Sequence, residues 1–456
     1  MTSKENVYFI GIGGIGMSAL ARYFSQNGCR VGGYDKTATP LTQQLEAEGI
    51  EIHYEDDLSL VAPEFKKKER ALIIYTPAIP NNHSEYNYFK TEGFELLKRS
   101  EVLGLITQSN KSVAISGTHG KTTISSMVAH VFHHCNIPFT AFLGGISKDL
   151  GSNYFHDSES KVTVIEADEY DRSFLHLHPE MIVVSAIDPD HLDIYGTKEE
   201  MQRTFKHFLT NNLSSNGIGL IHSSLKPILG NSYKTYSIED TEADYYTANF
   251  RVENSEFRAD FHWAGGVVED VKIGLPGIHN MENALAAFGV GIERGISPEE
   301  LKSAIARYTG VDRRFDVQLK TDKIVYIDDY AHHPAEITKL VESVRKMFPN
   351  RMVLGVFQPH LYSRTHDFAK GFAQSLELLD EVILLPIYPA RELPIPGVNS
   401  QMLLDLIQMN SKTLCSKKQL LSLIRASKCN VVLTIGAGDI GAEVQNVKEF
   451  LQKHRE

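Results

Sequence analysis

The sequence predicts an α/β protein with three domains. Short apolar runs typical of buried strands alternate with helical spacing along most of the chain, and glycine-rich turns follow two of these runs. The 456 residues are also too many for one core, since domains average about 150 residues. We expect a Rossmann-like domain over residues 1–109, a central P-loop ATPase-type α/β domain over 110–312 and a Rossmann-like α/β domain over 313–456.

The composition is that of an ordinary globular protein, with 42% hydrophobic and 23% charged residues. A formal charge of −11 argues against nucleic acid or an anionic membrane as a partner. The four cysteines form no CxxC pair, and we find neither a signal-peptide pattern nor about 18 consecutive apolar residues. We therefore expect a cytoplasmic protein, as a monomer or weak homodimer.

The first domain begins with a strand, residues 7–10, that enters the glycine-rich turn GIGGIG and then a helix. A second strand, residues 30–34, is followed by Asp35, about 20 residues beyond the glycines, where a dinucleotide-binding domain holds a ribose. The turn binds a diphosphate at a helix N-terminus whatever else the ligand carries, so NAD and a nucleotide-sugar both fit. Thr76 ends a later strand and is either a ligand contact or part of a plain structural loop. The candidate nucleotide-sugar residues are Gly11, Gly13, Gly14, Ile15, Gly16, Asp35 and Thr76.

The central domain contains the stretch SGTHGKTT, residues 116–123, between a buried strand and a helix. Glycines let such a loop enclose phosphate groups, Lys121 can reach the β- and γ-phosphates, and Thr122 can bind Mg²⁺. Ile115 occupies the position of the first Walker A glycine, so this is a shorter form. A simple helix-capping turn is the alternative, but the flanking strand and helix favour ATP. The candidate loop residues are Gly117, Thr118, His119, Gly120, Lys121, Thr122 and Thr123.

Two acidic clusters follow two further strands of this domain. Residues 166–171 come after the strand at 162–165, and residues 188–193, which include His191, come after the strand at 181–187. Carboxylates at the carboxyl ends of neighbouring strands can hold Mg²⁺, although charge runs are commonly solvated surface. His279, Asn280 and Asn283 stand at a later helix start and suit either an adenine edge or helix capping.

The third domain repeats the strand-then-helix pattern, with strands expected at 324–327, 352–357, 382–385 and 431–435. The loops that follow these strands are rich in His, Asp, Tyr and Arg. Such loops suit a small zwitterion and a phosphoryl group in transfer.

The motifs GTHGKTT, EADEYDRSFL, DPDHLDIYG, LPGIHNMENALAA, GVDRRF, DDYAHHP and FQPHLYSRT occur in this order. Together they resemble the Mur ligase family, and within it the branch that joins L-alanine to UDP-N-acetylmuramate. The resemblance implies that ATP, with Mg²⁺, converts the lactyl carboxylate to an acyl phosphate. The amine of L-alanine then attacks, and phosphate leaves a tetrahedral intermediate.

The resemblance also implies a role for each matching position. Catalytic roles fall on Lys121, Glu166, His191 and His360, and metal-binding roles on Thr122, Glu166 and His191. His279, Asn280 and Asn283 would contact adenosine, Arg314 the ATP phosphate or ribose, and Tyr330, His360 and Arg364 the amino acid. Leu361 replaces a basic residue common in the family and receives no substrate contact. Sites on three domains imply domain closure.

Three other functions stay open from the sequence. A recycling ligase that attaches a whole tripeptide to UDP-N-acetylmuramate would share the motifs of the first two domains. An NAD-dependent oxidoreductase would use Gly11 to Gly16 with Asp35, but it leaves GTHGKTT unexplained. A non-catalytic nucleotide-binding regulator would bind ATP without releasing phosphate.

Overall fold

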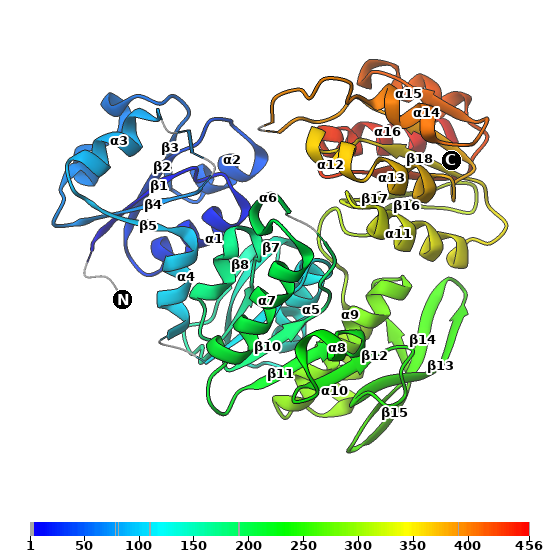
Figure 1. Cartoon of the computed structure of the whole chain (residues 1–456), viewed down its shortest axis with the longest axis horizontal. Helices are drawn as coiled ribbons and strands as arrows, with labels where there is room; N and C mark the ends of the chain where they lie inside the picture. Colours follow the sequence, from blue (N-terminus) through cyan, green and yellow to red (C-terminus); the bar gives the residue numbers. More distant parts are fainter. Residues whose placement is uncertain are drawn as a thin grey trace. The chain divides into compact units, whose positions relative to one another are not determined.

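The computed structural model describes residues 4–77, 79–80, 82–108, 111–189, 192–390 and 392–455. It confirms the predicted α/β class, with parallel-rich sheets of 5, 10 and 6 strands in three domains (Figure 1). Two compact units are distinguished. The first comprises residues 1–247, 261–268 and 283–305, and the second comprises residues 248–260, 269–282 and 306–456.

The first sheet has the strand order β3-β2-β1-β4-β5, and all of its pairs are parallel. This is the Rossmann-like arrangement that the sequence predicts, with the glycine-rich turn at the end of the central strand. The strands are β1 (Asn6–Ile10), β2 (Arg30–Tyr34), β3 (Glu51–His53), β4 (Ala71–Tyr75) and β5 (Glu95–Lys98). The helices are α1 (Ile15–Gln26), α2 (Pro40–Ala47), α3 (Ser84–Thr91) and α4 (Arg99–Gln108).

Both faces of the first sheet are buried, as expected for a parallel sheet covered by helices. Val7 and Phe9 of β1 join a cluster that includes Leu20 and Phe24 of α1. Tyr8 and Ile10, which point to the opposite face, join a second cluster that includes Phe65 and Phe89. Because successive strand residues face opposite sides, the continuous apolar run of β1 serves two cores.

The central sheet has the order β15-β14-β13-β12-β11-β10-β6-β9-β7-β8. The strands from β7 through β9, β6, β10, β11 and β12 to β13 pair in parallel, and β8 pairs with β7 in antiparallel orientation. The strands are β6 (Lys111–Ser116), β7 (Phe139–Ser147), β8 (Ser152–His156), β9 (Val162–Glu166), β10 (Met181–Val184), β11 (Ile218–His222), β12 (Lys234–Ser237), β13 (Tyr245–Glu253), β14 (Glu256–Trp263) and β15 (Gly266–Ile273). The helices are α5 (Lys121–His134), α6 (Leu192–Tyr195), α7 (Lys198–His207), α8 (Lys226–Leu229), α9 (Ile278–Glu293) and α10 (Pro298–Arg307).

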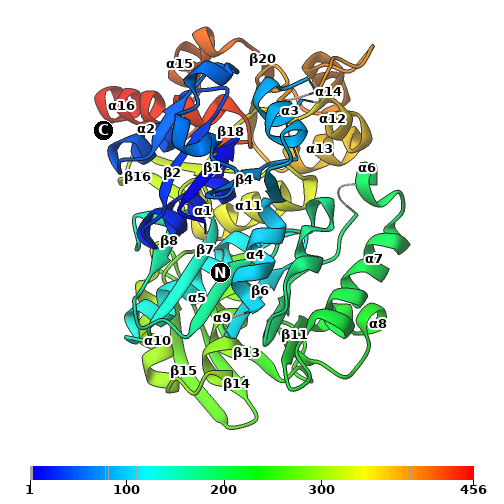
Figure 2. The ribbon, with the colours of Figure 1, turned by 90° about the vertical axis from the view of Figure 1, so that its left-hand side faces the viewer.

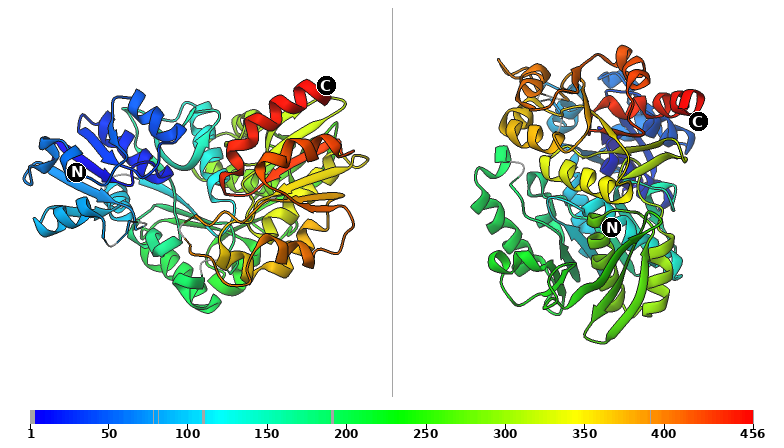
Figure 3. Two further views of the ribbon diagram at one scale, coloured as in Figure 1. Left: turned by 90° about the horizontal axis from the view of Figure 1, so that it is seen from above. Right: turned by 90° about the vertical axis from the view of Figure 1, so that its right-hand side faces the viewer.

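The third sheet has the order β16-β17-β21-β18-β19-β20, with β16 antiparallel and the others parallel. Its helices lie on both faces, with α15 and α16 packed against one of them (Figure 3). The strands are β16 (Asp316–Lys320), β17 (Val325–Asp329), β18 (Val353–Phe357), β19 (Glu381–Leu384), β20 (Lys412–Leu414) and β21 (Val431–Ile435). The helices are α11 (Pro334–Met347), α12 (Tyr362–Asp367), α13 (Ala369–Leu376), α14 (Ser400–Leu406), α15 (Lys417–Ala426) and α16 (Val444–Arg455).

Helix α1 joins the first sheet to the central sheet within the first unit, where it lies beside β7 and β8 (Figure 2). Asn153 of β8 is fully buried there and accepts a hydrogen bond from Nη1 of Arg22. Its amide donates to the carbonyl of Ile15 and, at 2.9 Å, to Oγ of Ser18. Glu48 binds the other side of the Arg22 guanidinium at 2.7 and 2.8 Å. One buried amide thus fixes the helix that follows the first glycine turn.

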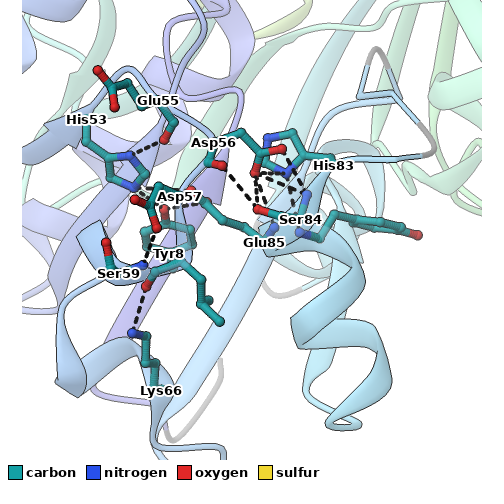
Figure 4. A network of polar contacts seen from close by, with 12 residues as sticks. Tyr8, His53, Glu55, Asp56, Asp57, Ser59, Lys66, His83, Ser84 and Glu85 are labelled. Atoms are coloured by element: carbon teal, nitrogen blue, oxygen red, sulfur yellow. Dashed lines mark hydrogen bonds and ion pairs between the residues drawn. The ribbon is translucent and has the colours of Figure 1, made fainter.

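A buried polar network lies within the first domain (Figure 4). The Tyr8 hydroxyl is 2.7 Å from Oε2 of Glu85, which is fully buried in the first turn of α3. The same hydroxyl is 2.7 Å from Nε2 of His53, whose Nδ1 lies 2.9 Å from the Glu55 carbonyl oxygen. Burial raises the pKa of Glu85 to about 7, and burial lowers the pKa of His53.

These contacts determine which atoms of Tyr8, His53 and Glu85 act as hydrogen-bond donors and which as acceptors. A carbonyl oxygen only accepts, so Nδ1 of His53 carries a hydrogen and, in the neutral ring, Nε2 accepts from Tyr8. The Tyr8 oxygen is then satisfied by a hydrogen from Glu85. If Glu85 ionises while His53 stays neutral, the single hydroxyl hydrogen faces two acceptors. A protonated Glu85 therefore satisfies every contact of this network.

We predict that the variant Glu85→Gln gains stability relative to the parent protein as the pH rises. A carboxyl group whose pKa is raised by folding stabilises the fold below its unfolded pKa and loses that contribution as the pH rises through about 7. The glutamine amide donates to Tyr8 at every pH. We expect the difference in free energy of unfolding to grow by roughly 2 kcal/mol between pH 5 and 8, measured by urea denaturation.

Glu92→Gln, at the exposed C-terminal end of α3, is the matched control and should show no such trend. A difference that stays flat for Glu85→Gln would mean that Glu85 is ionised in the folded protein across this range.

None of the helices within the described residues is both long and apolar enough to cross a lipid bilayer. All four cysteines lie in the described part of the chain, and none of them forms a disulfide.

Candidate functional site

The first glycine turn lies against two of the side chains that the sequence singled out. Gly11 has a φ of +88°, and a Cβ there would come within 2.5 Å of the Thr76 methyl group. The N–H of Gly13 donates to Oδ2 of Asp35 at 2.7 Å, and Oδ1 of Asp35 accepts from the N–H of Thr37 at 3.2 Å. Asp35 therefore braces the turn itself, a role that the dinucleotide comparison did not suggest.

Helix α1 starts at Ile15 with Gly14 as its N-cap, and no side chain caps its first turn. Its backbone N–H groups are therefore open to an anion, as a diphosphate site requires. Gly16 lies in this first turn against the guanidinium of Arg99, because a Cβ on Gly16 would overlap Nη1 of Arg99. Arg99 was not among the predicted site residues, although it is a basic residue directly after β5.

The second glycine turn connects β6 to α5, as predicted. Gly117 and Gly120 have φ values of +131° and +82°, and a Cβ on Gly117 would collide with Ser185. Thr118 ties the turn to the chain after β10, since its N–H donates to the Ala186 carbonyl at 2.9 Å and its hydroxyl accepts from Asp188 N–H at 3.0 Å. No side chain caps the start of α5, so this helix end is also open to phosphate.

Lys121 is the first residue of α5, and its ammonium group is held by two partners. It donates to the Gly117 carbonyl at 2.7 Å and lies 2.7 and 2.9 Å from the two carboxylate oxygens of Glu169. Burial lowers the pKa of Lys121, but the carboxylates of Glu169, Asp168 and Glu166 outweigh this and raise it overall. The lysine is therefore charged and directed back over the turn. Glu169, which is 1% exposed, was part of the acidic cluster in the sequence but was not selected.

Two of the three proposed metal ligands are described. Glu166 ends β9 directly beside β6, and its Oε2 accepts from the Gly144 N–H at 3.0 Å. Thr122 is 7% exposed, and its hydroxyl has no hydrogen-bond partner among the described residues. A carboxylate and a free hydroxyl are oxygen ligands that suit Mg²⁺. His191 lies outside the described residues, and within them no group of three His, Cys, Asp or Glu side chains could hold a metal.

The three proposed adenosine residues all lie at the start of α9. A Cβ on Gly120 would come within 2.8 Å of Oδ1 of Asn283, so Asn283 lies beside the second glycine turn. The amide of Asn280 donates to the Pro276 carbonyl at 2.7 Å, which is a local helix-start contact. Burial lowers the pKa of His279 to about 4, so its ring is neutral at physiological pH.

The proposed amino-acid residues gather at strand ends of the third sheet. The ring of Tyr330 lies 5.4 Å from that of His332, and the ring of His332 lies 6.1 Å from that of His360. Arg314 stands over Tyr330, with its guanidinium carbon 4.9 Å from the ring centre. Burial lowers the pKa of His332 to about 4, an effect to which the nearby charge of Arg364 contributes. His332 belongs to this cluster although the sequence analysis assigned it no role.

Leu361 follows His360 and has a φ of +67°, which is unusual for a branched residue. Its N–H donates to the Tyr388 carbonyl at 3.0 Å, and the His360 and Tyr388 rings stack at 5.7 Å. The turn after β18 is thereby fixed to the segment after β19.

A cavity of about 190 Å³ lies between α1, α4 and the central sheet, within the first unit. It is lined both by the first glycine turn and by the acids at and just after the end of β9. Its walls are Ile15, Gly16, Ala19, Arg99, Leu103, Phe142, Leu143, Gly144, Glu166 and Asp168. A proposed diphosphate site and a proposed metal ligand thus share one cavity.

Comparison with known proteins agrees with this arrangement along nearly the whole chain. The Mur ligase family catalytic domain matches residues 6–111, the Mur ligase middle domain matches 115–291, and the Mur ligase glutamate ligase domain matches 313–438. The UDP-N-acetylmuramate-L-alanine ligase of Parabacteroides distasonis is 50% identical, over 98% of this chain and 97% of its own length. The ligase of the same name from Porphyromonas gingivalis is 47% identical, over 98% of this chain and 99% of its own length.

Solved structures show the same fold. The UDP-N-acetylmuramate-alanine ligase of Thermotoga maritima has a TM-score of 0.83 at 28% identity. The match covers 98% of this chain and 99% of the Thermotoga chain. A murein peptide ligase from Psychrobacter arcticus, at 22% identity, has a TM-score of 0.71 over 98% of both chains, which shows the fold alone. The family matches and the relatives at 47–50% identity together establish that this chain belongs to the Mur ligase family.

Proposed function

We propose that this protein is an ATP-dependent ligase that joins L-alanine to the lactyl carboxylate of UDP-N-acetylmuramate, a step in peptidoglycan precursor synthesis. The observation that carries the proposal is the cavity in which the first glycine turn and Glu166 both take part. A nucleotide-sugar held at α1 can present its acyl end there, next to the phosphate turn of α5. The relatives named above act on the same two substrates.

The reaction needs an activated carboxylate, because an amine does not displace oxide from a carboxylate ion. Transfer of the γ-phosphoryl group of ATP to the lactyl carboxylate gives an acyl phosphate and ADP. The amine of L-alanine adds to the acyl carbon, and the tetrahedral intermediate expels phosphate as the amide forms. The product is UDP-N-acetylmuramoyl-L-alanine.

The chain's own residues serve this route in distinct ways. Lys121 and the N–H groups at the start of α5 stabilise the negative charge on the transferring phosphoryl group. Thr122, Glu166 and His191 would hold Mg²⁺, which supplies further charge neutralisation at the phosphates when bound. Asn283, beside Gly120, and His279 and Asn280, which precede it on α9, would contact adenosine.

The third domain would supply the amino-acid site. Tyr330, His360 and Arg364 would surround L-alanine, with Arg364 pairing its carboxylate, and Arg314 would contact ATP. Domain boundaries at 109/110 and 312/313 fit this division of labour, although the first boundary falls on residues outside the described part of the chain. The absence of disulfides among the four cysteines is consistent with the cytoplasm as the location.

The test is phosphate release from ATP and Mg²⁺ in the presence of UDP-N-acetylmuramate, with L-alanine, the stem tripeptide or no amine, and products identified by mass. We expect release that depends on L-alanine and a product heavier by one alanine residue. Release with the tripeptide alone would identify the recycling ligase instead. No release under any condition, together with NADH binding, would favour the oxidoreductase.

A further inference from the structure

Arg99 is a cation in the lining of the cavity of about 190 Å³ described above. It is the first residue of α4, its guanidinium lies against Gly16 of the first glycine turn, and Nη2 lies 3.1 Å from Oδ2 of Asp168. Its side chain is 22% exposed, so it is partly withdrawn from solvent. Arg99 thus touches the turn proposed for the diphosphate and the acidic loop that follows Glu166.

Most of the guanidinium's hydrogen-bonding capacity is unused. Among the described residues Asp168 is its only hydrogen-bond partner, through Nη2, whereas a guanidinium has five N–H donors. Nε and Nη1 therefore have no protein acceptor in this part of the chain. An arginine fork of this kind is suited to bidentate binding of a carboxylate or a phosphate.

The rest of the cavity indicates which anion fits. Ala19, Leu103 and Phe142 give it apolar surface, and Glu166 and Asp168 give it two carboxylates. An anionic ligand in a cavity of about 190 Å³ with two carboxylates requires a compensating cation, and Arg99 is the one that lines it. The apolar surface accommodates a methyl-bearing group better than a second phosphate.

We propose that Arg99 binds the lactyl carboxylate of the nucleotide-sugar and holds it toward Glu166 before the phosphoryl group is transferred. Asp168 fixes the guanidinium in this position, and Gly16 leaves the space that it occupies. The inference rests on the proposed function, since it assigns a specificity contact within the same site. It makes Arg99 the group that distinguishes a muramoyl from a glucosaminyl nucleotide-sugar.

The experiment is calorimetric binding of UDP-N-acetylmuramate and of UDP-N-acetylglucosamine, which lacks the lactyl group, without ATP. The parent protein, Arg99→Met and Arg99→Lys are compared. Arg99→Met should bind UDP-N-acetylmuramate about 10- to 100-fold more weakly, with UDP-N-acetylglucosamine binding unchanged. Arg99→Lys should recover part of the loss, since it restores the charge without the fork.

Arg70→Met is the matched control, because Arg70 lies in the same domain and its side chain is 62% exposed. If Arg99→Met melts at a lower temperature than the parent, the double variant with Asp168→Asn removes the uncompensated acid and is measured in its place. Equal loss for both nucleotide-sugars would assign Arg99 to the diphosphate and overturn the proposal, as would no loss for either. Failure of the parent protein to bind UDP-N-acetylmuramate would instead count against the proposed function.

Discussion

The variant Lys121→Met is expected to lose at least about 1,000-fold in kcat/KM for L-alanine-dependent phosphate release. Lys121 is the cation at the phosphate turn, and methionine keeps its length without its charge. Steady-state phosphate release with saturating UDP-N-acetylmuramate is the measurement. Lys111→Met is the matched control, because Lys111 is 67% exposed and begins the strand that leads to the turn. We expect no change in phosphate release for this variant.

Loss of folding must be separated from loss of chemistry in this variant. Lys121 is the ion-pair partner of Glu169, which is 1% exposed, so Lys121→Met leaves a buried carboxylate without its cation. The double variant Lys121→Met with Glu169→Gln removes that charge and should melt near the parent temperature while staying inactive. A double variant with parental activity would exclude Lys121 from the reaction.

The variant Asn153→Ala is expected to lose about 3 kcal/mol in free energy of unfolding. The fully buried amide bridges Arg22, Ile15 and Ser18, and its removal leaves a buried guanidinium nitrogen and a buried carbonyl without partners. Because Ile15 starts α1, UDP-N-acetylmuramate should also bind more weakly. Urea denaturation measures the first effect and calorimetry the second.

Asn216→Ala is the control for this substitution, since Asn216 is an exposed turn residue with no hydrogen bond from its side chain among the described residues. A loss below about 0.5 kcal/mol for Asn153→Ala would mean that water or a neighbouring group takes over the contacts of the amide.

Much of the strand and helix pattern could be predicted from the sequence. Buried parallel strands read as continuous apolar runs, which is why β1 and β21 were predicted within a residue of their bounds. The strands β13 to β15 were not predicted, although β14 alternates between buried and less buried residues as a strand with one buried face does. Polar residues at every second position concealed its apolar character.

The two glycine turns were predictable because their backbone conformation depends on local sequence. Backbone conformation at Gly117 and Gly120 requires glycine, and the flanking strand and helix are adjacent in the chain. Glu169, Arg99 and His332 were not predictable in the same way. Glu169 contacts a residue 48 positions away, Arg99 one 69 positions away and His332 one 28 positions away. Such pairs follow from the tertiary fold rather than from local spacing.

Asp35 shows a further limit of motif-based reasoning. Its distance from the glycines predicts a ribose contact, which stays a prediction, and the folded loop adds that its carboxylate accepts hydrogen bonds from the N–H of Gly13 and the N–H of Thr37. A motif fixes which residue stands near the turn, but the number of donors around a carboxylate is a property of the folded loop.

Leu361, in the turn after β18, holds a backbone conformation with a φ of +67° and a ψ of 140° that glycine would adopt at lower energy. That turn loses its conformational freedom when the protein folds, because the Tyr388 carbonyl accepts from the Leu361 N–H and the rings of His360 and Tyr388 stack. A ligand of the amino-acid site proposed at His360 would therefore meet a loop that is already ordered. Preorganisation of this kind lets a substrate as small as one amino acid, with few contacts of its own, be captured without ordering the protein around it.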